Sequence, residues 1–329
     1  EFIGANTDAQ VLRTCLAPRK ILLGPKTTQG HGAGGDPKIG EAAAEESLYE
    51  ITDALSGADM VFLTAGMGGG TGTGAIPVAA RIAKGMDMVS IAVVSMPFSF
   101  EAGLRQQNAR NGLTRLQQNT DTLISIPNDR LLQIVDKKSS LQDSFKTADD
   151  VLRQGIQGIS EVITVPGLIN LDFADVKAVM SEGGAALMAV GRASGEDRAI
   201  KAAEQAISNQ LLDITIDGAR GILFNITGGS SLSLFEVNQA AAIIKETAHP
   251  DVNMIFGAVI DPDMEDELRI TVIATGFDRA GARKSASVPA VKNEGFPYGQ
   301  QAAQRETVSV DSSREPGISF GPTTIDTDM

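Results

Sequence analysis

The chain has 329 residues, and its 41 acidic side chains outnumber its 28 basic ones, which gives a formal net charge of −13. A surface this negative repels polyphosphate backbones, so we expect no nucleic-acid partner. Apolar residues make up 42 % of the chain, enough for a sizeable core, but no apolar run reaches the length of a membrane span, so we expect no direct membrane insertion. The single cysteine, Cys15, excludes an internal disulfide and indicates a reducing, cytoplasmic compartment.

In the first part of the chain, short apolar runs alternate with longer helical patterns. The apolar runs predict buried strands at 60–66, 88–94 and 121–127, after a strand-like start at Glu1. The helical patterns cover 37–56, 75–85 and 101–118. Alternation of this kind is typical of βαβ units, so we expect an α/β domain with a parallel sheet over residues 1–141.

A long helix and a second α/β region follow. Apolar residues recur at helical spacing over residues 142–164, which predicts one continuous helix. Residues 165–279 then form a smaller α/β domain. Its expected helices begin at Asp172 and cover 195–211 and 233–248, and its expected strands are 221–226, 253–260 and 268–277. Residues 280–329 are rich in Ser, Gly, Pro and charge and cannot bury enough apolar surface to fold, so we expect a disordered tail.

The stretch AGMGGGTGTGAIP, residues 65–77, joins the first of these strands to the helix that follows it. A glycine turn between a parallel strand and a helix lets backbone N–H groups converge on an anion, and the helix dipole strengthens the attraction. Thr71 and Thr73 can add hydroxyl donors, so the stretch predicts a phosphate site. It lacks the Lys-Ser/Thr ending of a P-loop and matches the dinucleotide fingerprint only loosely. A dinucleotide-dependent oxidoreductase therefore stays open as an alternative.

Seven stretches of the chain, in the same order, resemble the FtsZ family, the bacterial cell-division GTPases of the tubulin superfamily. They are NTDAQ (6–10), GAGGDP (32–37), GGGTGTG (68–74), PFSFEAGLR (97–105), IPNDRLL (126–132), TADDVLRQGIQGI (147–159) and GLINLDFADVKAVMSEGG (167–184). The resemblance covers residues 1–279 and leaves out the tail. It implies a Rossmann-like, parallel-sheet GTPase domain over 1–141, a central helix over 142–164 and a smaller C-terminal α/β domain over 165–279.

The resemblance also implies a binding site for GTP, built from several parts of the chain. The phosphates would be held by Gly70, Thr71 and Gly72, with Ala33, Gly34 and Gly35 near the terminal phosphate. Glu101 and Arg105 would meet the ribose and phosphate side; without the resemblance they read as an i,i+4 surface ion pair.

The base of GTP would be held by Asn128, Asp149 and Asp150, with Phe145 close to its ring. A carboxylate suits guanine because guanine presents a ring N–H and an amine there, and adenine presents neither. Without the resemblance, Asp149 and Asp150 read as a solvated helix face.

A second acidic pair, Asp172 and Asp175 in NLDFADV, stands at a helix start. The residues alone favour a capping box, with Asp172 as N-cap and Asp175 three residues later. The resemblance implies instead that this loop docks on the nucleotide of the next subunit, where both carboxylates orient the attacking water and Asn170 helps to position the site. The two roles are compatible, because a capping carboxylate keeps lone pairs free.

A site divided between two subunits implies head-to-tail filaments, because a heterologous contact repeats without closing. The resemblance further implies Mg²⁺ beside the GTP, a location at the division site, and division-machinery and membrane-anchor proteins as partners. A scaffold of the same fold that does not hydrolyse GTP is a second alternative.

The chain departs from the family pattern at two places. Ala102 stands where the family has glycine. The strand, glycine turn and helix with which the family begins do not precede Glu1, so we expect about 30–40 further residues before it, the usual size of a βα unit. The last residues, ISFGPTTIDTDM, do not resemble the family's anchor-binding peptide.

Overall fold

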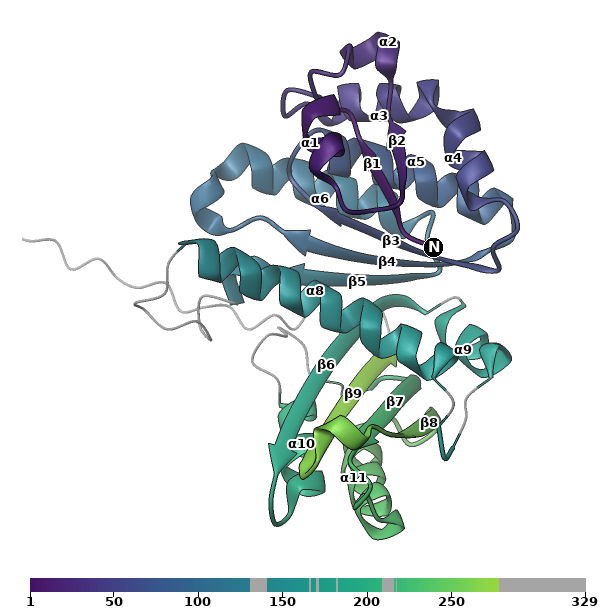
Figure 1. The fold of residues 1–329 in the computed structure, drawn as a ribbon, viewed down its shortest axis with the longest axis vertical. Coiled ribbons are helices and arrows are strands. Elements are labelled where there is room, and N and C mark those ends of the chain that lie inside the picture. Colours follow the sequence, from purple (N-terminus) through teal and green to yellow (C-terminus); the bar gives the residue numbers. More distant parts are fainter. Residues whose placement is uncertain are drawn as a thin grey trace, which may run out of the picture. The chain divides into compact units, whose positions relative to one another are not determined.

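A seven-stranded sheet is the largest element of the computed structural model, with the strand order β3-β4-β5-β6-β9-β7-β8 among the residues described (Figure 1). Those residues are 1–130, 141–165, 167–169, 172–181, 183–208, 216 and 218–277. The strands are β3 (Met60–Gly66), β4 (Val89–Met96), β5 (Thr122–Pro127), β6 (Gly184–Ser194), β7 (Gly221–Gly228), β8 (Asn253–Ile260) and β9 (Glu267–Thr275). Strands β3, β4 and β5 are parallel, which confirms the predicted parallel sheet. The predicted tail lies outside the described residues.

Strand β6 connects the two halves of this sheet, and the sequence analysis missed it. Its first residues pair in parallel with β5, from Thr122 opposite Gly184 onward. From Leu187 opposite Ala274 onward, it pairs with the antiparallel strand β9. The sequence GAALMAVGRAS is rich in Ala and Gly, which have low strand propensity, so only the two flanking strands make it a strand.

A separate group of short elements comes first in the chain. Strands β1 (Ile3–Asn6) and β2 (Arg19–Leu22) pair in parallel, which agrees with the strand-like start of the sequence. The helices of this group are α1 (Ala9–Thr14), α2 (Pro25–Thr28), α3 (Pro37–Glu46) and α4 (Leu48–Leu55). In the view of Figure 1 the group lies above β3 and β4.

The helical stretch predicted over 37–56 forms two helices, because the chain breaks at Ser47 into α3 and α4. Ser47 is buried, and its hydroxyl accepts a hydrogen bond from the backbone N–H of Gly24 at 3.0 Å. A serine side chain engaged in this way competes with helical backbone geometry. The break therefore serves a contact with the loop before α2, which no local pattern reveals.

The remaining helices include two short 3₁₀ helices that the sequence did not predict, whereas the α-helices agree with the predicted ones within a few residues at most ends. They are α5 (Thr71–Gly85), η1 (Ser99–Glu101), α6 (Gly103–Gln117), α8 (Leu141–Thr164), α9 (Phe173–Met180), α10 (Arg198–Ile207), α11 (Leu234–Thr247) and η2 (Pro262–Met264). Helix α5 begins four residues earlier than the predicted Ala75. Among the described helices, none combines the length and the apolar content that crossing a membrane requires.

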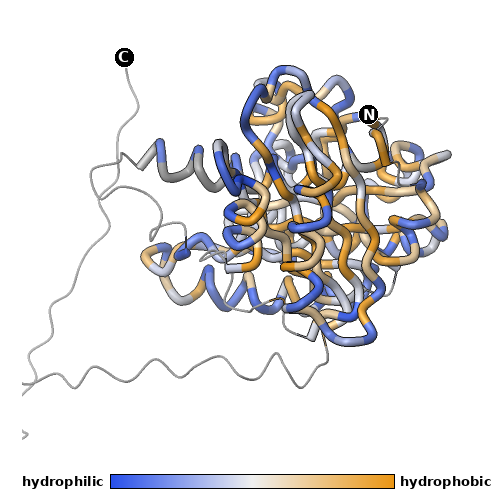
Figure 2. Tube along the Cα trace, turned by 90° about the horizontal axis from the view of Figure 1, so that it is seen from below, coloured by the Kyte–Doolittle hydropathy of each residue, from blue (hydrophilic) through white to orange (hydrophobic). Residues whose placement is uncertain are grey.

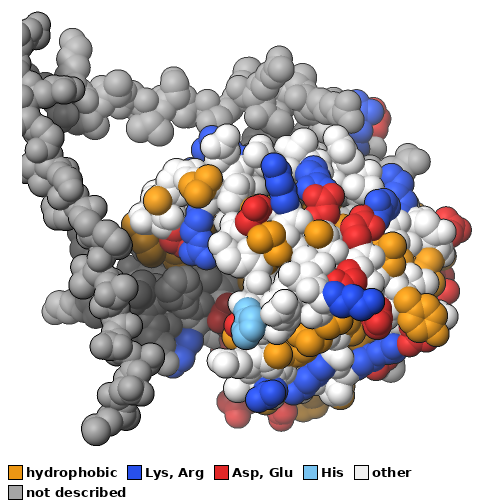
Figure 3. All heavy atoms as spheres, turned by 90° about the horizontal axis from the view of Figure 1, so that it is seen from above, with side chains coloured by type: hydrophobic (Ala, Val, Ile, Leu, Met, Phe, Trp, Pro, Cys, Tyr) orange, Lys and Arg blue, Asp and Glu red, His pale blue; other side chains and the backbone are white. Residues whose placement is uncertain are grey.

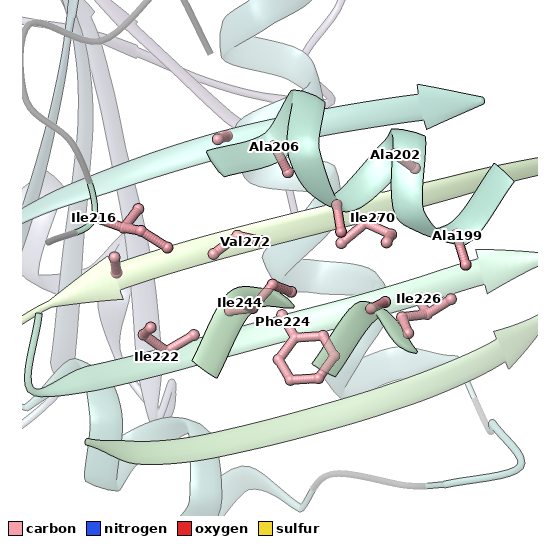
Figure 4. Close-up of a cluster of buried hydrophobic side chains, with 14 of the residues drawn as sticks. Ala199, Ala202, Ala206, Ile216, Ile222, Phe224, Ile226, Ile244, Ile270 and Val272 are labelled. Carbon is pink, nitrogen blue, oxygen red and sulfur yellow. The ribbon is translucent and has the colours of Figure 1, made fainter. Parts of the chain in front are cut away.

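Each face of the sheet has its own apolar core, because side chains alternate along the strands. Figure 2 shows hydrophobic residues along the strands in the interior and hydrophilic residues mostly at the periphery. In β4, Val89, Ile91 and Val93 join a cluster with α8 and α9, whereas Ala92 and Val94 join a cluster with α5 and α6. In the other half of the sheet, Figure 4 shows isoleucine, valine and phenylalanine side chains of β7 and β9 packed beneath α10 and α11.

Helix α8 packs across both halves of the sheet on one face (Figure 1). Two glycines allow this close approach. A Cβ at Gly155 would lie 3.2 Å from Met188 Sδ of β6, and one at Gly158 would lie 2.7 Å from Thr271 Cγ2 of β9. Farther along the helix, Glu161 accepts a hydrogen bond from Arg269 at 2.6 Å.

A buried arginine stabilises the C-terminal half of the sheet. Arg198, the first residue of α10, is 5 % exposed. Its guanidinium donates to Glu236 at 2.7 Å, to both the carboxylate and the backbone carbonyl of Asp266, and to the hydroxyl of Ser231. The hydrogen bond from Arg198 lowers the pKa of Glu236 below its ordinary value of 4.5. Three loops are thus joined through one cation.

Replacing this arginine should be costly. We expect Arg198→Ala to lower the free energy of unfolding by about 3–5 kcal/mol, because it leaves Glu236 without its buried partner. Arg81→Ala is the matched control, since Arg81 forms an exposed ion pair with Glu45 and should contribute less than about 1 kcal/mol. Chemical denaturation of both variants measures the difference. Equal losses of unfolding free energy in the two variants would show that burial of Arg198 adds nothing to stability.

The same pair makes stability depend on pH. Because folding lowers the pKa of Glu236, its contribution is complete above pH 4.5 and is lost as the pH falls through the folded value. We expect the stability difference between wild type and Glu236→Gln to be large at pH 7 and to shrink in acid. Denaturation of both proteins across this pH range provides the check, and a difference that is constant with pH would contradict the assignment.

Candidate functional site

The carboxyl ends of the parallel strands β3, β4 and β5 meet at one edge of the sheet, where ligands bind in open α/β folds. The segments that follow these strands are the glycine loop (residues 67–70), the turn 97–105 and Asn128. The loop 32–36 from the N-terminal group reaches the glycine loop as well, as the contacts below show. Four of the segments predicted to hold the nucleotide are therefore neighbours in the fold.

The glycine loop leads directly into α5. Gly68 has a φ of +100°, and its N–H donates to the hydroxyl of Thr73 at 2.8 Å. Gly70 is the N-cap of the 15-residue α5, so the free N–H groups of the first helical turn begin at this loop. The hydroxyl of Thr71 lies 2.6 Å from that of the buried Thr7. The loop thus has the arrangement by which helix N-termini bind anions in other proteins, with threonine hydroxyls beside it.

The loop 32–36 contacts the glycine loop. A Cβ at Gly70 would lie 2.8 Å from the Cβ of Ala33 and 2.9 Å from the backbone nitrogen of Asp36. Gly34 and Gly35 have φ values of +57° and +78°, and a Cβ on either would meet no atom within 4 Å. These two glycines are thus needed for the shape of the loop, and space remains in front of them.

Some glycines of the predicted phosphate motif are also needed for close packing. A Cβ at Gly74 would lie 2.1 Å from the carbonyl oxygen of Pro37, and one at Gly40 would lie 2.2 Å from that of Gly70. Gly72 would meet the carbonyl oxygen of Gly66 at 2.7 Å. Helix α3 therefore lies against the start of α5. Pro77 is the seventh residue of α5, where it cannot donate to the carbonyl of Thr73.

The turn 97–105 brings an ion pair to the glycine loop. Glu101 and Arg105 form the predicted i,i+4 pair, and the Glu101 carboxylate also accepts the N–H of Phe98 at 2.9 Å. The Arg105 guanidinium lies 3.9 Å from where a Cβ of Gly69 would stand, and its backbone oxygen lies 2.9 Å from where that of Gly68 would stand. One cation is thus held beside an otherwise uncharged loop.

Ala102 stands within this turn in an unusual backbone conformation. Its φ of +77° and ψ of +157° lie in a region that is essentially restricted to glycine and costs another residue about 1–3 kcal/mol. The departure noted in the sequence, alanine in place of the family's glycine, is therefore a point of strain. Strain of this kind persists only where neighbouring contacts hold the backbone.

Asn128 provides a buried acceptor at the end of β5. The residue is 7 % exposed, and its Oδ1 has no hydrogen-bond partner in the described part of the chain. A buried polar atom without a partner is costly in a folded protein, unless a ligand supplies the donor. This orphan oxygen fits a bound nucleoside, which carries N–H and hydroxyl donors.

The two aspartates of α8 have different surroundings. Asp150 accepts hydrogen bonds from Arg153 at 2.8 Å and from Gln154, and the bond from Arg153 lowers its pKa below the ordinary 3.8. Asp149 is exposed on the same helix. Phe145 belongs to α8 as well, but its side chain lies outside the described residues. Of the two carboxylates, Asp149 is the one that this hydrogen-bond pattern does not engage.

The second acidic pair lies at the opposite end of α8. Asp172 accepts the N–H of Asp175 at 2.8 Å, and Asp175 accepts the N–H of Asp172 at 3.3 Å. The predicted capping box of α9 is therefore confirmed. The preceding loop is tied to β8, since the N–H of Leu168 donates to Ala258 at 2.8 Å. Asn170 lies outside the described residues.

The described residues contain no group of three or more His, Cys, Asp or Glu side chains that could hold a metal ion. Magnesium prefers oxygen ligands and is commonly held by substrate phosphates and water with few protein ligands. The described side chains form no magnesium site of their own.

On the face shown in Figure 3, basic and acidic side chains are interspersed.

Two family models match the chain. The Tubulin/FtsZ family GTPase domain matches residues 1–136, and the FtsZ family C-terminal domain matches residues 184–278. Among solved structures, the chain is similar to the empty FtsZ dimer of M. jannaschii, with 47 % identity and a TM-score of 0.80, covering 83 % of this chain and 80 % of that one.

Two CetZ proteins of Haloferax volcanii share the fold at lower identity. CetZ2 in a GTPγS-bound protofilament is 23 % identical, with a TM-score of 0.70 and coverage of 84 % of each chain. CetZ1 as a GDP-bound monomer is 22 % identical, with a TM-score of 0.71, covering 84 % of this chain and 85 % of that one. The matches do not favour the oxidoreductase considered from the glycine turn. The resemblance drawn from the sequence motifs is confirmed: the chain belongs to the tubulin/FtsZ family of GTPases.

Proposed function

We propose that this chain is a GTP-hydrolysing subunit of a head-to-tail filament that acts in cell division. The observation that carries the proposal is the separation of two constellations. The loops 32–36 and 67–70, the turn 97–105 and Asn128 lie at the carboxyl edge of β3–β5, and Asp172 and Asp175 lie beyond the far end of α8. The first constellation suits nucleotide binding and the second suits hydrolysis.

The parts of the first constellation match the parts of GTP. The N-terminus of α5 and the loop 32–36 offer backbone N–H groups to phosphates, and Arg105 adds a positive charge. The orphan Oδ1 of Asn128 offers an acceptor to the nucleoside. Asp149 offers a carboxylate to the ring N–H and amine of guanine. This division of roles explains why glycines, one cation and the amide of Asn128 occur at the same edge of the sheet.

The acidic pair cannot complete the pocket of its own subunit. Helix α8 has 24 residues and is therefore about 36 Å long, and the part from Asp149 to Thr164 alone spans about 22 Å. The bond from Leu168 to Ala258 keeps the loop at that far end. A second copy must therefore supply the carboxylates, and a contact between unlike ends repeats into an open filament. The relative from M. jannaschii is described as an FtsZ dimer.

At such a junction, Asp172 and Asp175 of one subunit would face the terminal phosphate bound by the next. Each capping bond uses one lone pair of its carboxylate. Both carboxylates can therefore still accept a hydrogen bond from a water molecule and orient it for in-line attack. Asn170 would help to position this water. Mg²⁺, entering with the phosphates, would neutralise charge on their oxygens. The protein's part is positioning and orientation.

The proposed cellular role follows from the same assembly. A filament whose own reaction cuts its nucleotide can be taken apart after it forms, which suits a transient ring at the division site in the cytoplasm. Division-machinery proteins and membrane anchors are the proposed partners. The cellular role and these partners follow from the family resemblance, and they depend on GTP hydrolysis.

Guanine preference tests Asp149. We expect wild type to bind GTP far more tightly than ATP, and Asp149→Ala to weaken GTP binding about 10–100-fold, because a hydrogen bond to a charged group is lost. Asp150→Ala is the matched control, since Asp150 is engaged by Arg153 and Gln154 and should change the affinity for GTP much less. Competition titrations with GTP and ATP measure both. Equal affinity of wild type for the two nucleotides removes Asp149 from the base site.

Asp175 tests the shared active site. We expect Asp175→Ala to bind GTP nearly as wild type does, to lose most of its turnover and to form longer-lived filaments, because the attacking water loses its orienting carboxylate. Wild-type turnover per subunit should rise with protein concentration, and a 1:1 mixture should give the mean of its components, because a wild-type loop completes the intact pocket of a mutant neighbour. Phosphate release at matched concentrations measures this.

A conservative variant separates catalysis from capping. Asp175→Asn keeps an oxygen that can accept the N–H of Asp172, so its melting temperature should stay close to that of wild type while turnover is lost. If Asp175 only caps α9, Asp175→Ala should instead lose about 0.5–2 kcal/mol of stability, with unchanged turnover per folded subunit. That result would leave Asp175 a structural cap only, whereas the scaffold that does not hydrolyse GTP predicts no phosphate release from wild type at any concentration.

A further inference from the structure

The turn 97–105 is held from outside by Asp129, a residue to which the sequence motifs assigned no role. Asp129 follows Asn128 at the end of β5, and the turn follows β4. The Asp129 carboxylate accepts the backbone N–H of Ser99 at 2.7 Å and, through its other oxygen, the Ser99 hydroxyl. Both bonds go to a charged acceptor, which makes them the stronger kind of hydrogen bond.

Within the turn, several contacts fix the residues on either side of Glu101. Phe98 is fully buried and stacks on Phe100 at 5.0 Å, and its N–H donates to Glu101. The side chain of Gln106 donates to the carbonyl of Pro97 at 3.2 Å, which ties the end of the turn to its beginning. The strand side of the turn is thus fixed by burial and its middle by Asp129.

The strain lies immediately after these fixed points. Ala102 keeps its glycine-like φ of +77°, although its side chain is exposed and no packing of that side chain forces the conformation. The backbone would relax if the neighbouring residues allowed it, and Glu101 and Arg105 would then move. The contacts of Ser99 with Asp129 connect this turn to the segment that follows β5.

We infer that Asp129 is a positioning residue of the nucleotide site: it holds the turn 97–105 against the strain at Ala102, so that Glu101 and Arg105 face the bound nucleoside triphosphate. The inference rests on the proposed function, since it takes GTP as the ligand of this edge. It assigns Asp129 no contact with GTP; its effect passes through Ser99 and the turn. Ala102 makes the clamp necessary in this chain, because glycine would hold the same conformation without strain.

The test measures GTP affinity in a cycle of variants. Asp129→Ala should weaken the binding of a fluorescent GTP analogue about tenfold, as expected when a charge-assisted contact is lost through displacement of its partner. In the Ala102→Gly background the same substitution should weaken binding much less, because the turn no longer tends to relax. A role in stability alone would change melting temperatures but would not make the loss of affinity depend on residue 102.

Two further variants make the result decisive. Asp261→Ala removes a carboxylate that also accepts a backbone N–H at the start of a short 3₁₀ helix, η2, and should leave GTP affinity unchanged. Ser99→Ala removes only the hydroxyl donor, so it should give a smaller loss of affinity even if Asp129→Ala does not fold. If wild type binds GTP and neither Asp129→Ala nor Ser99→Ala lowers the affinity, this inference is overturned and the proposed function stands. Wild type that binds no GTP overturns the proposed function, and this inference with it.

Discussion

The close packing of α8 across a continuous sheet is the constraint on which the rest of the molecule depends. β6 changes partner from β5 to β9 within one strand, so two halves with different connectivity present one common face. α8 covers that face, and the missing side chains of Gly155 and Gly158 let it approach the strands closely. The apolar cluster beneath it draws on strands of both halves and on α9. The two halves therefore share an apolar core in addition to the strand pairing of β6.

The length of α8 then decides what one copy of the chain can do. Its first turns lie toward the nucleotide edge and its last turn leads to the capping box of α9, with about 36 Å between them. A rigid helix keeps these sites apart, so hydrolysis and assembly become one event in the proposed mechanism. The helix that packs on the sheet face therefore also keeps the two groups of residues apart, which is why the proposed mechanism requires a second subunit.

At the nucleotide edge, one sequence feature serves two physical purposes. Gly34, Gly35 and Gly68 have positive φ and shape the loops, whereas Gly40 and Gly74 remove side chains so that α3 and α5 can touch. The packing of these helices places the loop 32–36 beside the start of α5. The proposed phosphate site thus depends on helix packing as well as on donors. Ala102 shows the converse case, a strained residue whose conformation depends on contacts made elsewhere.

The sequence by itself determined the parallel strands, the long helix, the glycine turn and the capping box, because each follows from local periodicity or from spacing along the chain. It also pointed to Asn128, Glu101 and Arg105 through recognisable motifs. Only the tertiary structure decided that the Ala- and Gly-rich β6 is a strand, that Ser47 interrupts a helix, that Arg198 is buried and that Asp129 holds the turn beside it. These features depend on contacts between residues distant in sequence, and a local pattern carries no record of such contacts.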